Sequence, residues 1–272
     1  MFIKKSVFLF ILAFCLTISC FAQDPVEIQL AEQAMWKHKL SEDEQSIVDS
    51  FNVHRALGEI DSFEVNVKIS KAIKDKAEKI ILSHVDTDTI SIESKLVDFM
   101  SHFGDKAYVI KGGSYAEILD HIHLNEGVQT EISDKSNILL SISCVKDTLR
   151  DSLYLLLYMT KYQITYGACE TTVPKLMRKG DPITNISKIR GVTNGKYLMY
   201  KFYEGTALPF YYEGNKMLTE ELRTREDGSF SFELSYSGYG SELRRLAIFV
   251  RNEPEEPYSL VDFFPMPGGI SR

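Results

Sequence analysis

The sequence predicts an α+β protein with a helix-rich N-terminal lobe and an antiparallel, β-sandwich-like C-terminal lobe. Two features of the composition predict this class. Between Val26 and Phe103 there is no proline, no tyrosine and one glycine, whereas eleven of the sixteen glycines and seven of the eight prolines lie from Gly167 onward. All fourteen tyrosines lie at Tyr108 or later. Glycine and proline favour turns and tyrosine favours strands, so the second half should be rich in strands.

Residues 1–22 have the pattern of a secretory signal peptide. Lys4 and Lys5 precede an uncharged run that ends at Ala22, and its apolar centre is too short for a membrane-spanning helix. The ending Cys-Phe-Ala-Gln resembles export signals of Bacteroidota. We expect cleavage after Ala22, a periplasmic or secreted protein and no later transmembrane segment. The alternative is an outer-membrane lipoprotein, because Thr17-Ile18-Ser19-Cys20 resembles a lipoprotein box that would leave Cys20 lipidated.

The charge balance argues against nucleic acid and anionic membrane surfaces as partners. The chain has 31 basic and 38 acidic side chains and a net charge of −7, which becomes about −9 when Lys4 and Lys5 are removed. An acidic chain repels phosphate backbones, so nucleic acid is not an expected partner. An envelope protein, a peptide or a glycan remains as a possible partner.

Helix start signals recur in the first lobe, which we place at residues 23–150. Three segments combine a capping side chain with an acid three residues later: Asp24-Pro25-Val26-Glu27, Ser41-Glu42-Asp43-Glu44 and Ser114-Tyr115-Ala116-Glu117. The second helix should end at Gly58 and the third near Leu124. Helical spacing of apolar residues predicts two further helices, around 73–81 and 92–103.

Three segments of this lobe are predicted to be strands. Residues 63–69 alternate between apolar and polar, which is typical of a half-buried strand. Residues 107–110 form a short strand, and the apolar run 138–142 is a buried strand that the chain reaches by a crossover. This small βαβ-like unit makes the lobe α/β or α+β rather than purely helical.

The second lobe, placed at residues 151–272, has the pattern of antiparallel strands. Residues 152–166 are interpreted as β, although one uninterrupted helix is the alternative. Asn194-Gly195 and Asp227-Gly228 are dipeptides typical of β-hairpins. Apolar and polar residues alternate after the second dipeptide, from Ser229 to Tyr236, and Leu246, Ile248 and Val250 form a last run at alternate positions. Both runs are predicted strands.

One hairpin segment carries a family resemblance. Thr224-Arg225-Glu226-Asp227-Gly228-Ser229-Phe230-Ser231-Phe232 resembles the T-x-x-D-G-x-F-x-F hairpin of carboxypeptidase-regulatory-like, transthyretin-like β-sandwich modules. Gly191-Val192-Thr193-Asn194-Gly195-Lys196 resembles their opening turn, but the usual small-residue segment after it is replaced by Tyr197-Leu198-Met199-Tyr200. The resemblance covers about residues 186–250. It implies an accessory module without catalytic residues.

Histidine-dependent chemistry would have to reside in the first lobe, because all six histidines lie there. His121 and His123 have the spacing of a metal-binding pair, but on a helix their side chains diverge by about 200°. The sequence has no P-loop, no G-x-S-x-G, no H-E-x-x-H and no C-x-x-C. We therefore expect a non-catalytic binding or structural role, with no metal and no cofactor. The alternative is an exported hydrolase with a polar site formed by His84, Asp86, Asp88, His121 and Glu126.

Two cysteines remain after removal of the signal peptide, Cys144 and Cys169. Exported proteins enter an oxidising compartment, so we expect these two to form a disulfide. Two buried free thiols are the alternative.

Tyrosine and phenylalanine side chains of the second lobe are the predicted binding residues. On the segment 197–203, Tyr197, Met199, Lys201 and Tyr203 should face one way and the intervening residues the other. A strand with one face on the core and aromatic rings on the opposite face needs a cover there: another lobe, a partner or a sugar ring. The predicted binding residues are Tyr197, Tyr203, Phe210, Tyr211 and Tyr212.

Overall fold

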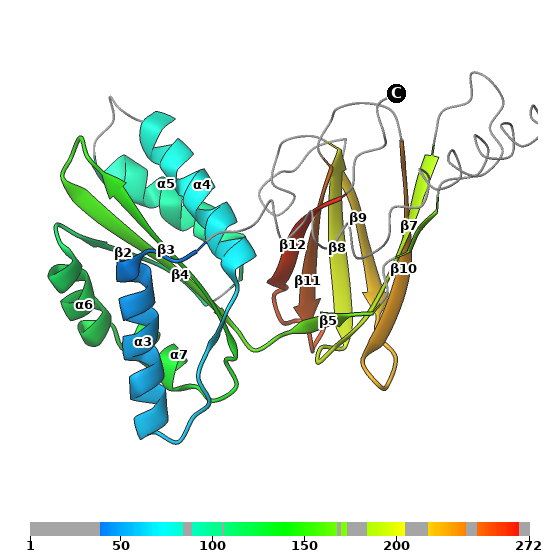
Figure 1. The fold of residues 1–272 in the computed structure, drawn as a ribbon, viewed down its shortest axis with the longest axis horizontal. Coiled ribbons are helices and arrows are strands. Elements are labelled where there is room, and N and C mark those ends of the chain that lie inside the picture. Colours follow the sequence, from blue (N-terminus) through cyan, green and yellow to red (C-terminus); the bar gives the residue numbers. More distant parts are fainter. Residues whose placement is uncertain are drawn as a thin grey trace, which may run out of the picture. The chain divides into compact units, whose positions relative to one another are not determined.

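The computed structural model describes residues 39–83, 89–104, 106–167, 170–172, 184–204, 217–237 and 244–266. All of them belong to one structural unit, residues 38–272. The predicted α+β class is confirmed, because the helices lie in the N-terminal lobe and two antiparallel sheets form the C-terminal lobe (Figure 1).

Sheet A belongs to the N-terminal lobe. It consists of β1 (Glu64–Val65), β2 (Ala107–Gly112), β3 (Leu139–Asp147) and β4 (Ser152–Thr160) in the order β1-β3-β4-β2. β1 is parallel to β3, and β4 is antiparallel to both of its neighbours. β2 and β3 therefore run parallel on either side of β4, and α6 (Tyr115–Leu124) and α7 (Glu126–Ser133) connect them. The predicted βαβ-like unit is confirmed, with β4 inserted between its strands.

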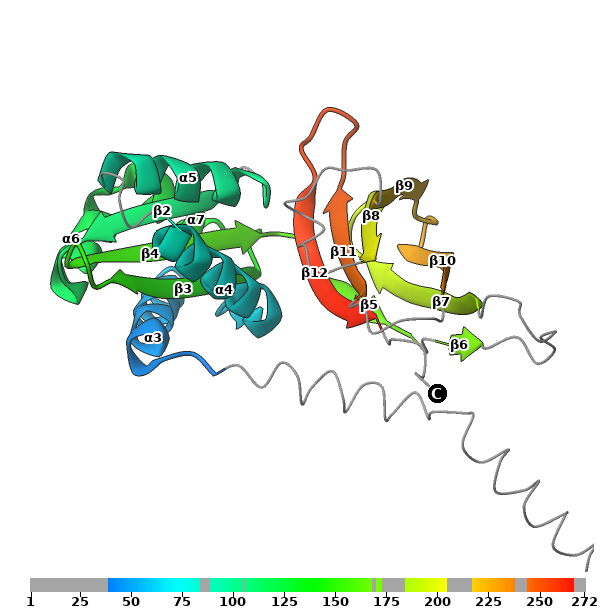
Figure 2. The same cartoon turned by 90° about the horizontal axis from the view of Figure 1, so that it is seen from above.

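Helices cover both faces of sheet A. α3 (Glu42–Leu57), α6 and α7 lie on one face, and α4 (Val67–Ser83) and α5 (Thr89–Ser101) lie on the other (Figure 2). Leu155 and Leu157 of β4 join the core on the first face. On the second face, the rings of Tyr158 and Phe103 have centroids 5.5 Å apart. Because both faces are buried, β4 is apolar almost throughout, and its sequence shows no period. It is a strand, so the helical alternative is wrong.

The predicted helix caps at Ser41 and Ser114 both form, but only the first is a complete capping box. The hydroxyl of Ser41 accepts a hydrogen bond from the Glu44 amide, and the Glu44 carboxylate accepts one from the Ser41 amide, as a capping box requires. Ser114 caps α6 in the same way. The Glu117 carboxylate, however, accepts from the amide of Gly113, one residue earlier than expected.

The strand predicted over residues 63–69 is mostly helix. Within this stretch only β1 is a strand, paired with β3, and α4 begins at Val67. The side chain of Asn66 accepts a hydrogen bond from the amide of Ile69 at 3.1 Å, so this asparagine caps the helix. A run of alternating residues this short fits the first turn of an amphipathic helix as well as it fits a strand.

The C-terminal lobe contains two sheets. Sheet B has the order β10-β7-β5, and β6 also pairs with β7; sheet C has the order β12-β11-β8-β9. The strands of sheet B are β5 (Ile164–Tyr166), β6 (Glu170–Thr172), β7 (Thr184–Thr193) and β10 (Ser229–Ser237). Those of sheet C are β8 (Tyr197–Glu204), β9 (Met217–Arg223), β11 (Arg244–Arg251) and β12 (Ser259–Met266).

Side chains from both sheets form one core, as in a β-sandwich. Phe230, Phe232 and Leu234 of β10 meet residues of β8 and β11 there. The rings of Tyr200 and Phe232 are stacked, with centroids 4.2 Å apart. The alternation predicted for 229–236 is confirmed over the residues whose burial the structure describes, because Phe230, Phe232 and Leu234 are buried. The run 246–250 is a strand as predicted, with Leu246, Ile248 and Val250 in this core, but Ala247 and Phe249 between them are buried as well.

The two predicted hairpins are wrong. Asn194-Gly195 joins β7 of sheet B to β8 of sheet C, and Asp227-Gly228 joins β9 of sheet C to β10 of sheet B. Gly228 has φ +76°, so the dipeptide does supply a tight turn. A Cβ atom at Gly195 would lie 2.0 Å from Val250 Cγ1, so close packing requires this glycine. Each dipeptide determines the turn, but core packing determines which sheet the next strand joins.

The strand pattern from residue 152 onward was predicted to belong to the second lobe, but β4 belongs to the first lobe. Its hydrogen bonds place it between β3 and β2, so sheet A runs to Thr160 and the sandwich starts with β5.

The N-terminal lobe supplies hydrogen bonds to β12. The amide of Leu260 donates to the Phe103 carbonyl at 3.1 Å, and the buried Tyr158 hydroxyl donates to the Leu260 carbonyl at 2.8 Å. The Asn66 side chain donates to the Val261 carbonyl at 3.1 Å. Main-chain groups of β12 are thus satisfied by residues of the other lobe.

Candidate binding surface

The side chains of β8 alternate between a buried and a half-buried face, as predicted. Leu198, Tyr200 and Phe202 are buried in the sandwich core. On the opposite side, Tyr197, Met199, Lys201 and Tyr203 are half-buried.

Pairing with β11 and β9 extends this face over three strands. Directly paired residues share a face of a sheet. We call this surface the outer face of sheet C. It is formed by Tyr197, Met199, Lys201 and Tyr203 of β8, with Arg251, Phe249, Ala247 and Arg245 opposite them on β11 and Arg223, Glu221, Thr219 and Met217 opposite them on β9.

The N-terminal lobe covers part of the outer face of sheet C. Ala247 and Phe249 lie on this face and yet are 0% and 3% exposed. Lys68 of α4 lies 3.5 Å from Asp262 of β12. Burial lowers the pKa of Arg245, and the nearby Asp75 of α4 acts in the opposite direction. Packing between the lobes therefore explains why residues on the β11 side of this face are buried. It does not explain the aromatic side chains on the β8–β9 side.

Two arginine side chains lie near the ring of Tyr197. The guanidinium carbon of Arg251 lies 5.5 Å from the ring centroid, and that of Arg223 lies 6.0 Å from it. Arg251 also lies over the ring of Tyr258, at 4.3 Å, and its Nη2 is 3.2 Å from a carboxylate oxygen of Glu221. These contacts hold Tyr197 at the surface with its ring against cationic groups.

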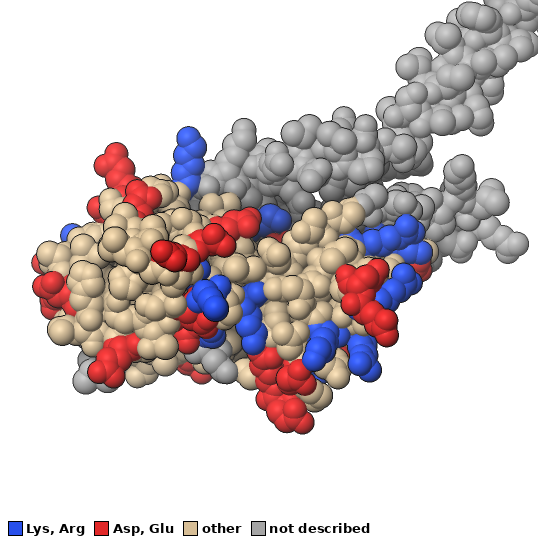
Figure 3. All heavy atoms as spheres, turned by 90° about the horizontal axis from the view of Figure 1, so that it is seen from below, with Lys and Arg blue, Asp and Glu red and all other residues tan. Residues whose placement is uncertain are grey.

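Lys201 and Arg223 have no carboxylate partner among the described residues. The Lys201 ammonium lies 5.5 Å from the centroid of the Phe249 ring. Figure 3 shows one face of the molecule. On this face, basic and acidic side chains lie together on the sandwich, and the area over the N-terminal lobe is largely uncharged. The β8–β9 side therefore combines aromatic rings with cations that are available to a ligand.

The other predicted binding residues have different outcomes. Tyr203 is half-buried on the outer face of sheet C, opposite Arg245 and Met217. Phe210, Tyr211 and Tyr212 lie outside the described residues.

The residues of the alternative hydrolase site are described only in part. His84, Asp86 and Asp88 lie outside the described residues. His121 is exposed on α6, with Nδ1 2.8 Å from the Lys111 carbonyl, and Glu126 is exposed at the start of α7. His121 and His123 are on a helix, as expected. In the part of the chain that the structure describes, no group of three histidine, cysteine or acidic side chains is arranged to hold a metal ion.

Cys144 is a free thiol, so the predicted disulfide is not seen. Its sulfur accepts a hydrogen bond from the Tyr115 hydroxyl at 3.0 Å, and burial raises its pKa to about 12. Cys169 lies outside the described residues. Cys144 lies in β3 of sheet A and packs with the helices of the N-terminal lobe.

Two buried charges of α3 were not predicted from the sequence. Arg55 of α3 is 1% exposed and donates to four main-chain carbonyl groups, and Glu44 is 0% exposed and accepts from the Cys144 amide at 2.8 Å. Hydrogen bonds from Cys144 and Ser41 lower the pKa of Glu44 against the effect of burial, which raises it. Both charges join α3 to other elements, and neither points to a ligand.

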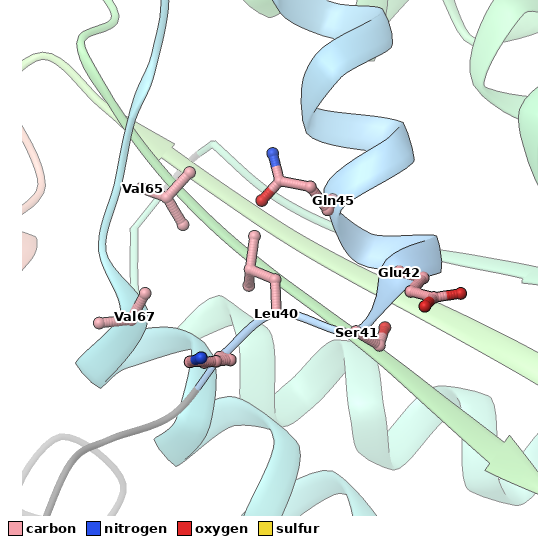
Figure 4. Close-up of a pocket in the computed structure, with 7 residues that line it drawn as sticks. Leu40, Ser41, Glu42, Gln45, Val65 and Val67 are labelled. Carbon is pink, nitrogen blue, oxygen red and sulfur yellow. The ribbon is translucent and has the colours of Figure 1, made fainter.

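A hollow of about 620 Å³ lies where α3 begins. Its apolar part consists of Leu40, Val65 and Val67, and Ser41, Glu42 and Gln45 come from the start of α3 (Figure 4). None of the predicted site residues lines it.

The fold and this surface define a two-lobed α+β protein in which a helix-covered sheet packs against a β-sandwich. Comparison of the chain with protein-family models gives no match, and comparison with curated proteins gives none either. No helix among the described residues is long and apolar enough to cross a membrane.

Proposed function

We propose that this chain is an exported, envelope-associated protein with a non-catalytic binding role, and that the outer face of sheet C is its binding surface. The observation that carries the proposal is the division of β8, which buries one row of side chains in the core and leaves Tyr197 and Tyr203 half-buried on the other side. Aromatic rings outside a core are typical of contact surfaces.

Export is supported by the N-terminal pattern of Lys4, Lys5 and a short apolar run that ends at Ala22. The location is the periplasm or the exterior, and lipidation at Cys20 would place the protein at the outer membrane instead. Intact-mass measurement of the exported protein distinguishes the two, because cleavage after Ala22 leaves Gln23 as the N-terminus and lipidation leaves a diacylated Cys20.

The resemblance of residues 186–250 to carboxypeptidase-regulatory-like modules supports a binding role, since it implies an accessory module without catalytic residues. Charged side chains that the structure describes also support it. Arg55 and Glu44 are buried and Glu256 is half-buried, and each is held by hydrogen bonds that connect elements of the fold. The thiol of Cys144 is kept protonated by its raised pKa, which is unfavourable for a nucleophile.

Retention on cell-envelope material tests the proposal. Tyr203→Ala, and separately the double variant Tyr211→Ala/Tyr212→Ala, should reduce retention of the exported protein strongly while the melting temperature changes little. Leu57→Ala is the control, because this residue is 83% exposed on α3 in the other lobe. Unchanged retention by both tyrosine variants would contradict the proposal, and loss of folding would identify these tyrosines as packing residues.

A further inference from the structure

We propose that the β8–β9 side of the outer face of sheet C binds an acidic glycan, a polymer of sugars that carry carboxylate groups. This inference rests on the binding role proposed above and assigns a ligand class to the same surface.

The charge of this surface is opposite to that of the chain. The whole chain has a net charge of −7. On the β8–β9 side, Lys201 and Arg223 are cationic, and the carboxylate of Glu221 is already paired with Arg251 at 3.2 Å. Lys201 and Arg223 therefore offer two positive charges that no described carboxylate neutralises. A carboxylate-bearing ligand complements these charges, and the negative remainder of the molecule disfavours attraction of polyanions at other places.

The aromatic rings favour a sugar polymer over an acidic peptide. Tyr197 and Tyr203 are six residues apart on one face of β8, which corresponds to roughly 20 Å along the strand. Arg223 pairs with Tyr197, and Lys201 lies two residues from Tyr203. A ring and a cation thus occur together at each end of the row. Tyrosine rings pack against the apolar faces of sugar rings, and the cations bind their carboxylates.

The position on the face of the sheet also separates the two ligand classes. A peptide that binds to a β-sheet commonly adds a strand to its edge through main-chain hydrogen bonds. The cations and rings of the β8–β9 side project from the face of the sheet. They are placed to contact a ligand that lies across the strands.

The experiment is affinity electrophoresis of the folded chain, residues 23–272, in gels that contain polygalacturonate, neutral dextran or poly-glutamate. We expect retardation by polygalacturonate that decreases with salt, no retardation by dextran and little by poly-glutamate. The double variant Lys201→Glu/Arg223→Glu should bind polygalacturonate about tenfold more weakly or worse. Lys201→Arg/Arg223→Lys should retain binding, and thermal melting monitors folding of every variant.

A matched control exists on the other sheet. Lys188 and Arg190 of β7 lie on the outer face of sheet B, and Arg190 is exposed like Arg223. Lys188 differs from Lys201 in that it is paired with Glu233 at 3.2 Å. Lys188→Glu/Arg190→Glu makes the same change in net charge and should leave polygalacturonate binding unchanged.

Four results would overturn the acidic-glycan assignment: an equal loss in the sheet B control, equal binding of dextran, equal binding of poly-glutamate, or no binding of any of the three polymers. If retention on envelope material still depends on Tyr203 in such a case, the proposed binding role stands and only the ligand class is wrong. If retention is also independent of the tyrosines, both proposals fall.

Discussion

Replacement of Arg55 by methionine tests how α3 is joined to the rest of the N-terminal lobe. Nε donates to the Asp61 carbonyl at 2.6 Å and Nη2 to the Asn137 carbonyl at 2.8 Å. Nη1 donates to the carbonyls of Ile132 and Asp134, at 2.9 and 3.2 Å. The guanidinium carbon lies 4.0 Å from the centroid of the Phe63 ring. One side chain therefore connects α3 to the loop before β1 and to the α7–β3 connection.

The expected loss of stability follows from these contacts. A hydrogen bond to a charged group contributes about 1.5–3 kcal/mol, and contributions within one group are not additive. Methionine fills much of the space but leaves the carbonyl groups without their donor. Removal of one member of a buried charged network costs about 3–5 kcal/mol, so we expect a loss in this range for Arg55→Met.

Urea unfolding followed by far-ultraviolet circular dichroism measures this loss. Arg55→Lys should lose less, because lysine keeps the charge but lacks the planar arrangement of donors. Lys95→Met, at an exposed position of α5, is the control and should change stability by less than about 0.5 kcal/mol. A loss below about 1 kcal/mol for Arg55→Met would refute the reasoning, because the four carbonyls would then be satisfied without the guanidinium.

Three further predictions concern single polar groups. Because burial raises the pKa of Cys144 to about 12, the thiol should react slowly with iodoacetamide at pH 8 in the folded protein and rapidly after unfolding; fast reaction of the folded protein would contradict the buried position. Hydrogen bonds from Lys161 and Tyr162 lower the pKa of Glu256 from 4.5 to about 2 against the opposing effect of burial, so its contribution of about 1–3 kcal/mol should be present above pH 4.5 and disappear as the pH falls toward 2. Glu256→Gln should therefore destabilise at pH 7 and much less near pH 2, with the exposed Glu255→Gln as control; an equal effect at both pH values would argue against the shift. Tyr158→Phe removes a buried hydrogen bond to β12 and should cost about 1–2 kcal/mol, whereas Tyr154→Phe should be neutral or stabilising, because the buried Tyr154 hydroxyl has no hydrogen-bond partner among the described residues; equal losses in thermal unfolding would disprove this contrast.

Local patterns predicted the local structure well. The capping box at Ser41, the helix that ends near Leu124 and the alternation over 229–236 are all found, because each depends on contacts within a few residues. The division of β8 was predictable for the same reason, since a strand has a period of two.

Long-range contacts account for most of the differences. The turns at Asn194-Gly195 and Asp227-Gly228 carry the expected dipeptides, yet strand pairing across them depends on residues from both sheets that meet in the core. β12 was not predicted, because Asp262 interrupts its apolar run; Lys68, far away in the sequence, lies 3.5 Å from that carboxylate. The environment of Arg55 depends equally on residues about 80 positions later.

The candidate surface was predictable only as a row of side chains on one strand. Tyr197 and Tyr203 were found from the alternation of β8. Arg223 and Arg251 were not, because their position beside Tyr197 depends on the pairing of β8 with β9 and β11.

The hydrogen bonds to β12 have a consequence for the way this sandwich can be reused. A β-module that is transferable between proteins has to contain its own hydrogen-bond partners, or other protection, for the main-chain groups of its edge strands. In this protein the partners for the main chain of Leu260 and Val261 come from the preceding lobe, from Phe103, Tyr158 and Asn66. Separation after Thr160 would leave these main-chain groups open to pairing with any other exposed strand. The sandwich is therefore tied to its N-terminal neighbour, and the pair is expected to be inherited and exchanged as one piece.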